Sequence, residues 1–210
     1  EYLLTQFNVI VTYLRLLILP VGQNMDHVYP ISRAFLEPGT VISFTLLLSV
    51  ILMAVILFKR WRVGSFFILW FFIIISPTST ILPINDVIAE HRLYLPSVGI
   101  FFITASGMVW IFERFRRRHS LLIFIHCVLL MLVTAILWSA TYRRNLLWNS
   151  RIAMWQDVVK KAPDNDRGHD SLGLAYQNKG LFEKAVEQHE YALKLKPYYD
   201  PSVYKNLGVA

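Results

Sequence analysis

The chain has 210 residues, of which 55% are hydrophobic and 17% are charged. A soluble domain of average composition has about 45–50% apolar and about 25% charged residues. The formal net charge is +7, but much of the excess lies in two short basic clusters between apolar segments, at residues 59–62 and 114–118. Charge in such places usually fixes membrane topology, which argues against a nucleic-acid-binding protein. The composition instead indicates a membrane region that ends near Tyr142, followed by a soluble region.

Five segments are candidates for membrane-spanning helices, because about 20 mostly apolar residues are needed to cross the hydrocarbon core. They comprise residues 2–20, 41–58, 64–84, 94–112 and 120–142. The first segment is the least apolar, and its Arg15 either reaches the membrane surface near a helix end or faces a polar cavity. In the third segment, Pro77 and Pro83 predict either a kink or an unwound end that faces an outer cavity.

The basic clusters also predict how these spans are oriented. Alternation of the spans places both clusters on one side, which the positive-inside rule identifies as cytoplasmic, with Arg143-Arg144 as a weaker contrary signal. The loop at 21–40, the loop at 83–94 and everything after Tyr142 then lie on the extracytoplasmic side. The chain begins within an apolar stretch and ends within a repeat, so we expect an internal fragment of a longer protein.

The soluble region has the spacing of a tetratricopeptide (TPR) unit of about 34 residues. Its signature consists of small and aromatic packing positions, a turn glycine and a closing proline: Leu172, Gly173, Tyr176, Gly180, Phe182, Ala185, Ala192 and Pro197. The pattern predicts a half unit at 148–163, a full unit at 166–197 and the start of another at 201–210. The predicted fold is therefore all-α, with a polytopic transmembrane helical bundle at residues 1–142 and a TPR α-solenoid at 143–210. Such solenoids present a concave groove, so we expect a protein or peptide partner.

The second outer loop has the pattern of a short interfacial helix. Asn85 is of a type that commonly caps a helix N-terminus. In a helix that starts there, Asp86, Glu90 and Tyr94 would share one face. Pro96 would end it, because the residue before a proline disfavours helical backbone angles.

Glu90, His91 and Arg92 bring an acid, an imidazole and a guanidinium to the mouth of the fourth span. Arginine pairs with phosphate through two parallel hydrogen bonds, and a glutamate or histidine can move a proton. These groups suit a phosphorylated or anionic lipid headgroup. The alternative is an interfacial ion pair between Glu90 and Arg92, with Tyr94 as an aromatic anchor. The histidines show no metal-ligand spacing, and we expect neither a metal nor a cofactor.

The string Glu90–Gly99 resembles the TMTC group, membrane proteins with C-terminal TPR repeats, and its bacterial relatives. In that family an outer loop carries Glu, Arg and then Leu-Tyr-x-Pro-Ser before a span, whereas here His91 stands between the Glu and the Arg. Residues 13–17 and 20–30 are also similar, as is the order of spans and repeats. The resemblance implies a GT-C glycosyltransferase that uses a polyprenyl-phosphate sugar as donor. In animal members it implies protein O-mannosylation on the lumenal side.

By this resemblance Glu90, Arg92 and Tyr94 are candidates for contact with the donor phosphate or headgroup. His91, Asp26 and His27 complete the candidate substrate-binding set. The family's presumed catalytic acid lies in an earlier loop of the parent protein, so no catalytic residue is assigned and we expect this fragment alone to be inactive.

The expected location is a bacterial inner (plasma) membrane, with an endoplasmic reticulum membrane as the alternative. The alternative function is a non-catalytic, membrane-anchored TPR scaffold for envelope or secretion assembly. A transporter ranks last, since the spans carry few ionisable residues.

Overall fold

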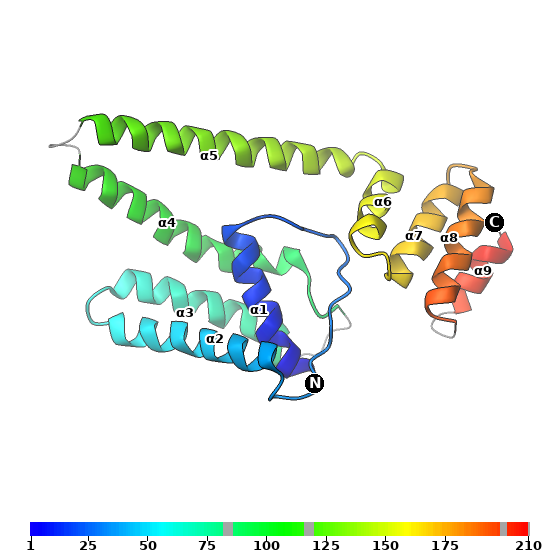
Figure 1. Cartoon of the computed structure of the whole chain (residues 1–210), viewed down its shortest axis with the longest axis horizontal. Helices are drawn as coiled ribbons and strands as arrows, with labels where there is room; N and C mark the ends of the chain where they lie inside the picture. Colours follow the sequence, from blue (N-terminus) through cyan, green and yellow to red (C-terminus); the bar gives the residue numbers. More distant parts are fainter. Residues whose placement is uncertain (82–85, 116–119, 198–200, 210) are drawn as a thin grey trace. The chain divides into compact units, whose positions relative to one another are not determined.

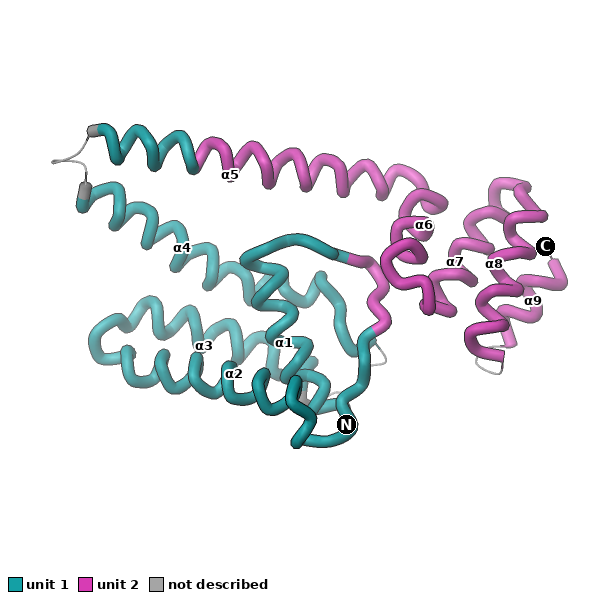
Figure 2. Tube along the Cα trace, in the orientation of Figure 1, with its two compact units in different colours: residues 1–23, 29–129 teal, residues 24–28, 130–210 magenta. Residues whose placement is uncertain are grey.

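The computed structural model describes residues 1–81, 86–115, 120–197 and 201–209, which form helices and connecting loops with no β-strand among them (Figure 1). The chain divides into two compact units (Figure 2). Unit 1 comprises residues 1–23 and 29–129, and unit 2 comprises residues 24–28 and 130–210. The division falls within a long apolar helix, α5 (Ser120–Leu147), and domain boundaries at 1–142 and 143–210 stay a prediction.

Four helical segments of the described chain are long and apolar enough to cross a membrane. They are Pro38–Leu57, Arg62–Ser79, Glu90–Arg114 and Leu121–Leu147, and they coincide with four of the five expected spans. The corresponding helices are α2 (Pro38–Leu57), α3 (Arg62–Ser76), α4 (Tyr94–Phe115) and α5. Helix α1 (Tyr2–Ile18) is apolar but has only 17 residues, so a span at 2–20 stays a prediction.

The core of unit 1 forms around α1. Helix α1 packs against α2, and α3 packs against both α2 and α4. The buried apolar cluster takes Val9, Ile10, Tyr13 and Leu16 from α1, Leu47 from α2, and Phe71 and Ile75 from α3. Arg15 lies in the last turn of α1 and is exposed, which agrees with a position near a helix end.

The third span changes its helical form at the first proline. Helix α3 ends at Ser76, and Pro77–Ile81 continue as a wider π-helical turn. Wider turns of this kind occur where the regular hydrogen-bond ladder is interrupted, and proline has no N–H to donate to it. The hydroxyl of Tyr2 donates to the Thr78 carbonyl oxygen at 2.6 Å. Pro83 and Asn85 lie outside the described residues.

Glu37 stabilises the turn that precedes α2. Its Oε1 accepts hydrogen bonds from the backbone N–H of Arg33 at 2.9 Å and of Ala34 at 3.1 Å. These bonds favour the charged carboxylate, and they lower the pKa of Glu37 below its ordinary value of 4.5. A carboxyl whose pKa is depressed by folding stabilises the folded form above its unfolded pKa, and this contribution is lost as pH falls through the folded pKa.

We therefore expect the 33–37 turn to be intact at neutral pH and to loosen only below the ordinary glutamate pKa of 4.5. The measurement is the pH dependence of the Arg33 and Ala34 amide proton shifts in selectively ¹⁵N-labelled protein. Glu37→Gln is the control, because glutamine has no titratable group at this position. A midpoint at or above 4.5 in the unmodified protein would contradict the assignment.

Unit 2 contains helices α6 (Arg151–Lys161), α7 (Asp166–Gln177), α8 (Phe182–Leu195) and α9 (Pro201–Val209), each packed against the next. The helix expected from Trp148 begins at Arg151, because the Ser150 side chain caps it by accepting from the Ala153 N–H. Asn165 caps α7 in the same way through the Gly168 N–H at 2.9 Å.

The α7–α8 hairpin depends on two glycines. Gly180 adopts φ +72° in the turn, a backbone angle that favours glycine. A Cβ added at Gly173 would lie 2.6 Å from the His189 ring, so this glycine allows the helices to approach closely. The helices α7 and α8 therefore lie within residues 166–197, where the TPR spacing predicted a pair of helices. Their assembly into a TPR solenoid stays a prediction.

Candidate functional site

The loop that carries Glu90, His91 and Arg92 enters the membrane helix through a short 3-10 turn. Residues 86–89 are neither helix nor strand, Glu90–Leu93 form the 3-10 turn, and α4 begins at Tyr94. The expectation that Pro96 ends an interfacial helix is wrong, since Pro96 lies in the first turn of α4. A proline fits there because first-turn N–H groups have no acceptor within the helix.

Helix α1 holds this loop through two buried polar side chains. The Tyr13 hydroxyl oxygen accepts a hydrogen bond from the Ala89 N–H at 2.7 Å. The same hydroxyl donates its proton to the Ala89 carbonyl oxygen at 3.1 Å. Gln6 donates from Nε2 to the Val87 carbonyl oxygen at 3.0 Å. Tyr13 and Gln6 are 0% and 1% exposed, so these bonds are made away from solvent.

Beside the loop lies a cavity of about 250 Å³ within unit 1. Its wall contains the Glu90 and His91 side chains together with Tyr94 and Ser97 at the start of α4. The rest of the wall comprises three leucines and a glutamine: Leu16, Leu17, Leu93 and Gln23. The cavity therefore combines an acid and an imidazole with an apolar wall contributed largely by the end of α1.

Arg92 is not one of the residues that line the cavity. Its Nη2 donates to the Asp86 carbonyl oxygen at 3.0 Å, and its backbone N–H donates to the Ala89 carbonyl oxygen at 3.1 Å. Both contacts close the loop on itself. The structure thus brings Glu90, His91 and Tyr94 to one cavity and gives Arg92 contacts with the loop backbone.

The other two candidate residues, Asp26 and His27, belong to unit 2. Asp26 Oδ1 forms an ion pair with Arg167 Nη2 of α7 at 2.6 Å. The Asp26 carbonyl oxygen accepts a hydrogen bond from Asn165 Nδ2 at 3.3 Å. Asp26 therefore contacts α7 and its N-terminal cap within unit 2, whereas the cavity beside Glu90 belongs to unit 1.

Sequence reasoning did not identify the contributions of Gln6, Tyr13, Leu16 and Leu17. Each is an ordinary residue of an apolar helix, and the partners of Gln6 and Tyr13 lie 81 and 76 residues away. The only signal was the similarity of residues 13–17 to the family. Within the described ranges, no group of three or more His, Cys, Asp or Glu side chains could hold a metal ion.

Comparison with known proteins supports the family resemblance. The chain is 28% identical over 151 residues to the human protein O-mannosyl-transferase TMTC1, a match that covers 71% of this chain and 16% of the relative. It is 30% identical over 131 residues to Drosophila melanogaster protein O-mannosyl-transferase Tmtc3, covering 60% and 14%. It is 30% identical over 113 residues to the Caenorhabditis elegans protein O-mannosyl-transferase F38B6.6, covering 54% and 15%.

The chain thus spans only about one sixth of the length of these relatives. No protein-family model matches the chain, and no solved structure matches it. Four apolar helices together with these relatives indicate an integral membrane protein. The resemblance to the TMTC family is confirmed: the chain is similar over more than half its length to proteins named as TMTC-type protein O-mannosyl-transferases.

Proposed function

We propose that this chain is the part of a membrane glycosyltransferase that binds the headgroup of a polyprenyl-phosphate sugar donor. The observation that carries the proposal is the cavity in which Glu90 and His91 lie beside Leu16 and Leu17. A sugar phosphate presents hydroxyl donors and a negative charge, for which a carboxylate and an imidazole are suitable partners. The first isoprene units are apolar, which suits the leucine side of the wall.

The size of the cavity favours a headgroup over a whole lipid. Binding sites for complete small molecules usually enclose about 300–1,000 Å³. The cavity beside Glu90 has about 250 Å³. We infer that sugar and phosphate enter it while the polyprenyl chain stays in the surrounding bilayer.

The proposed reaction is transfer of the sugar to a protein hydroxyl. The hydroxyl oxygen attacks the anomeric carbon, the bond from that carbon to the phosphate oxygen breaks, and the polyprenyl phosphate leaves. A base must accept the hydroxyl proton, and we assign none within this chain. Glu90, His91 and Tyr94 are proposed donor contacts, and Arg92 is proposed to support the loop through the Asp86 carbonyl.

The test uses the purified full-length parent, supplied with polyprenyl-phosphate mannose and an acceptor peptide. We expect mannose on the peptide. The proposal fails if the folded protein transfers no sugar and if Glu90→Ala or Arg92→Ala leaves cellular glycosylation unchanged.

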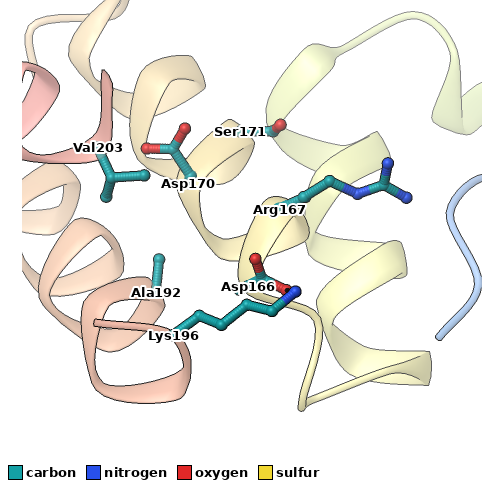
Figure 3. A pocket seen from close by; sticks show the side chains of 7 residues that line it. All are labelled: Asp166, Arg167, Asp170, Ser171, Ala192, Lys196 and Val203. Carbon is teal, nitrogen blue, oxygen red and sulfur yellow. Dashed lines mark ion pairs between the residues drawn. The ribbon is translucent and has the colours of Figure 1, made fainter. Parts of the chain in front are cut away.

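We further propose that the helices of unit 2 are TPR repeats that hold the protein acceptor. The 34-residue spacing, the α7–α8 hairpin and the Gly180 turn support this assignment. A cavity of about 220 Å³ lies between α7, the end of α8 and α9 (Figure 3). The Asp166 carboxylate there lies 3.8 Å from Lys196 Nζ, and the Asp170 carboxylate pairs with His189 Nδ1 at 2.8 Å. Charged groups beside an apolar wall suit an extended peptide.

The proposed topology places both the donor cavity and the repeats on the extracytoplasmic side, in a bacterial inner membrane or in the endoplasmic reticulum. We expect a membrane-impermeant maleimide to label His91→Cys and Glu190→Cys in intact cells or sealed vesicles of outward orientation. The background is Cys127→Ser, and Lys59→Cys in the cytoplasmic basic cluster is the control that should stay unlabelled. All three positions are exposed. Labelling of position 91 and of position 190 from opposite sides would exclude a shared compartment for donor and acceptor.

A non-catalytic scaffold is the second candidate function, and the unit 2 cavity is the observation that favours it. A scaffold predicts that Glu90→Gln has no effect in cells, whereas Lys196→Ala, at an exposed position of the cavity wall, weakens capture of the partner protein. An enzyme predicts that Glu90→Gln lowers glycosylation while the acceptor still binds.

A further inference from the structure

The loop before Glu90 makes many of its backbone hydrogen bonds with side chains. Residues 86–89 belong to no helix or strand, yet Ile88 and Ala89 are only 4% and 8% exposed. Buried backbone N–H and C=O groups almost always find hydrogen-bond partners. At Ala89 both groups bond the Tyr13 hydroxyl, which accepts from the N–H and donates to the carbonyl oxygen; that carbonyl oxygen also accepts from the Arg92 N–H.

A phenol is well suited to this arrangement because its oxygen accepts hydrogen bonds while its proton is donated. The aromatic ring places that oxygen rigidly, at the end of a side chain that is fully buried in the core of unit 1. Gln6, two helical turns earlier in α1, donates a hydrogen bond from its side-chain amide to the Val87 carbonyl oxygen. Two side chains of one helix therefore fix alternate residues of the loop.

The same helix also builds the cavity. Leu16 and Leu17, about one turn after Tyr13, form part of the wall that faces Glu90 and His91. Ala89 is the residue directly before Glu90, so a fixed Ala89 backbone fixes the point from which the Glu90 side chain starts. The distance between the acidic and the apolar parts of the wall thus depends on the Tyr13–Ala89 contact.

We propose that Tyr13 is a positioning residue for the donor headgroup. Its hydroxyl holds the Ala89 backbone, so that Glu90 and His91 stay aligned with the leucine wall. This proposal rests on the proposed function. Tyr13 itself does not line the cavity. Its removal is expected to displace the loop without removing any group that contacts the donor.

A matched control exists on the same helix. The Tyr2 hydroxyl also donates to a backbone carbonyl oxygen, that of Thr78, and this bond likewise joins residues 76 positions apart. Tyr2→Phe therefore removes a hydroxyl of α1 that also bonds a backbone carbonyl, but its partner lies in the π-helical turn and not in the 86–93 loop. A general loss of α1 packing affects both variants, whereas loss of positioning affects only Tyr13→Phe.

The experiment uses the full-length parent in lipid nanodiscs and compares Tyr13→Phe, Tyr2→Phe and the unmodified protein. In Tyr13→Phe we expect hydrogen exchange in peptides that cover 86–93 to become about five- to ten-fold faster, the effect of losing one or two hydrogen bonds. We expect kcat/KM for polyprenyl-phosphate mannose to fall about ten- to hundred-fold, because displacing substrate-positioning groups by about 1 Å can slow a reaction by about 100-fold. Tyr2→Phe should leave both quantities unchanged. If Tyr13→Phe fails to fold, Gln6→Met tests the same loop through the Val87 contact.

Two outcomes would overturn the proposal: loop exchange in Tyr13→Phe equal to that of the unmodified protein, or equal losses of kcat/KM in both tyrosine variants. Absence of transfer by the unmodified protein would instead overturn the proposed function. The exchange comparison needs no donor, so it still decides whether Tyr13 holds the loop.

Discussion

Glu90→Gln in the full-length protein is expected to lower kcat/KM for the polyprenyl-phosphate sugar by about 10- to 100-fold, because a hydrogen bond from a donor hydroxyl to a charged carboxylate contributes about 1.5–3 kcal/mol. Glutamine has the same size as glutamate and keeps the cavity filled, but it carries no charge. Glu90 is half-buried and lines the cavity together with His91 and the three leucines. The change therefore isolates the charge of this one group.

The measurement is single-turnover transfer from polyprenyl-phosphate mannose, which separates chemistry from donor binding. Glu113→Gln is the matched control, because Glu113 lies on the same helix and is exposed. Equal kcat/KM in the two variants would remove Glu90 as a donor contact. A larger donor KM with unchanged kcat would show that Glu90 contacts the donor equally before and during sugar transfer.

The helices were predictable from local pattern, because their signals lie within single segments. The apolar windows at 41–58, 94–112 and 120–142 match α2, α4 and α5 to within a few residues. In unit 2, the repeat spacing predicted a unit from residue 166 with a turn at Gly180, and α7 runs from Asp166 to Gln177 with Gly180 in the turn that follows. The error at Pro96 arose because a proline is compatible with two opposite positions, beyond the end of a helix and within its first turn.

The candidate site was only partly predictable, because its geometry depends on distant segments. The motif drew attention to Glu90 and His91, and the structure places both at one cavity. It gave no sign that Arg92 bonds the Asp86 carbonyl or that Asp26 pairs with Arg167 of unit 2. Such contacts join residues that are far apart in sequence or depend on side-chain direction, and local periodicity carries no information on either.

Gly99, the last residue of the family-like string, shows how that string also encodes packing. Helices in membranes approach each other closely where small residues face the partner helix. A Cβ built at Gly99 would lie 2.8 Å from the Phe67 carbonyl oxygen and 3.2 Å from Phe67 Cβ. The nearest atom belongs to the backbone of α3, so no change of side-chain rotamer relieves the contact.

Gly99→Ala is therefore expected to destabilise unit 1, because overpacking a tight interface usually costs about 1–3 kcal/mol. Alanine in a helix interior gains about 1 kcal/mol over glycine, so the net loss of stability is expected to reach about 2 kcal/mol where the Phe67 backbone does not yield. Gly107→Ala on the same helix is the control, because nothing lies within 4 Å of an added Cβ there. Thermal unfolding in detergent should show a lower Tm for Gly99→Ala and an equal or higher Tm for Gly107→Ala.

The same substitution is expected to reach the cavity. Ser97 and Tyr94 lie within the turn and a half of α4 before Gly99, and both form part of the cavity wall. Displacing α4 from α3 moves these residues relative to Leu16 and Leu17 of α1, so donor KM should rise along with the loss of stability. Phe67→Leu should not rescue Gly99→Ala, because it leaves the colliding carbonyl oxygen in place. Rescue by Phe67→Leu would show that the ring, and not the backbone, sets the distance between α3 and α4.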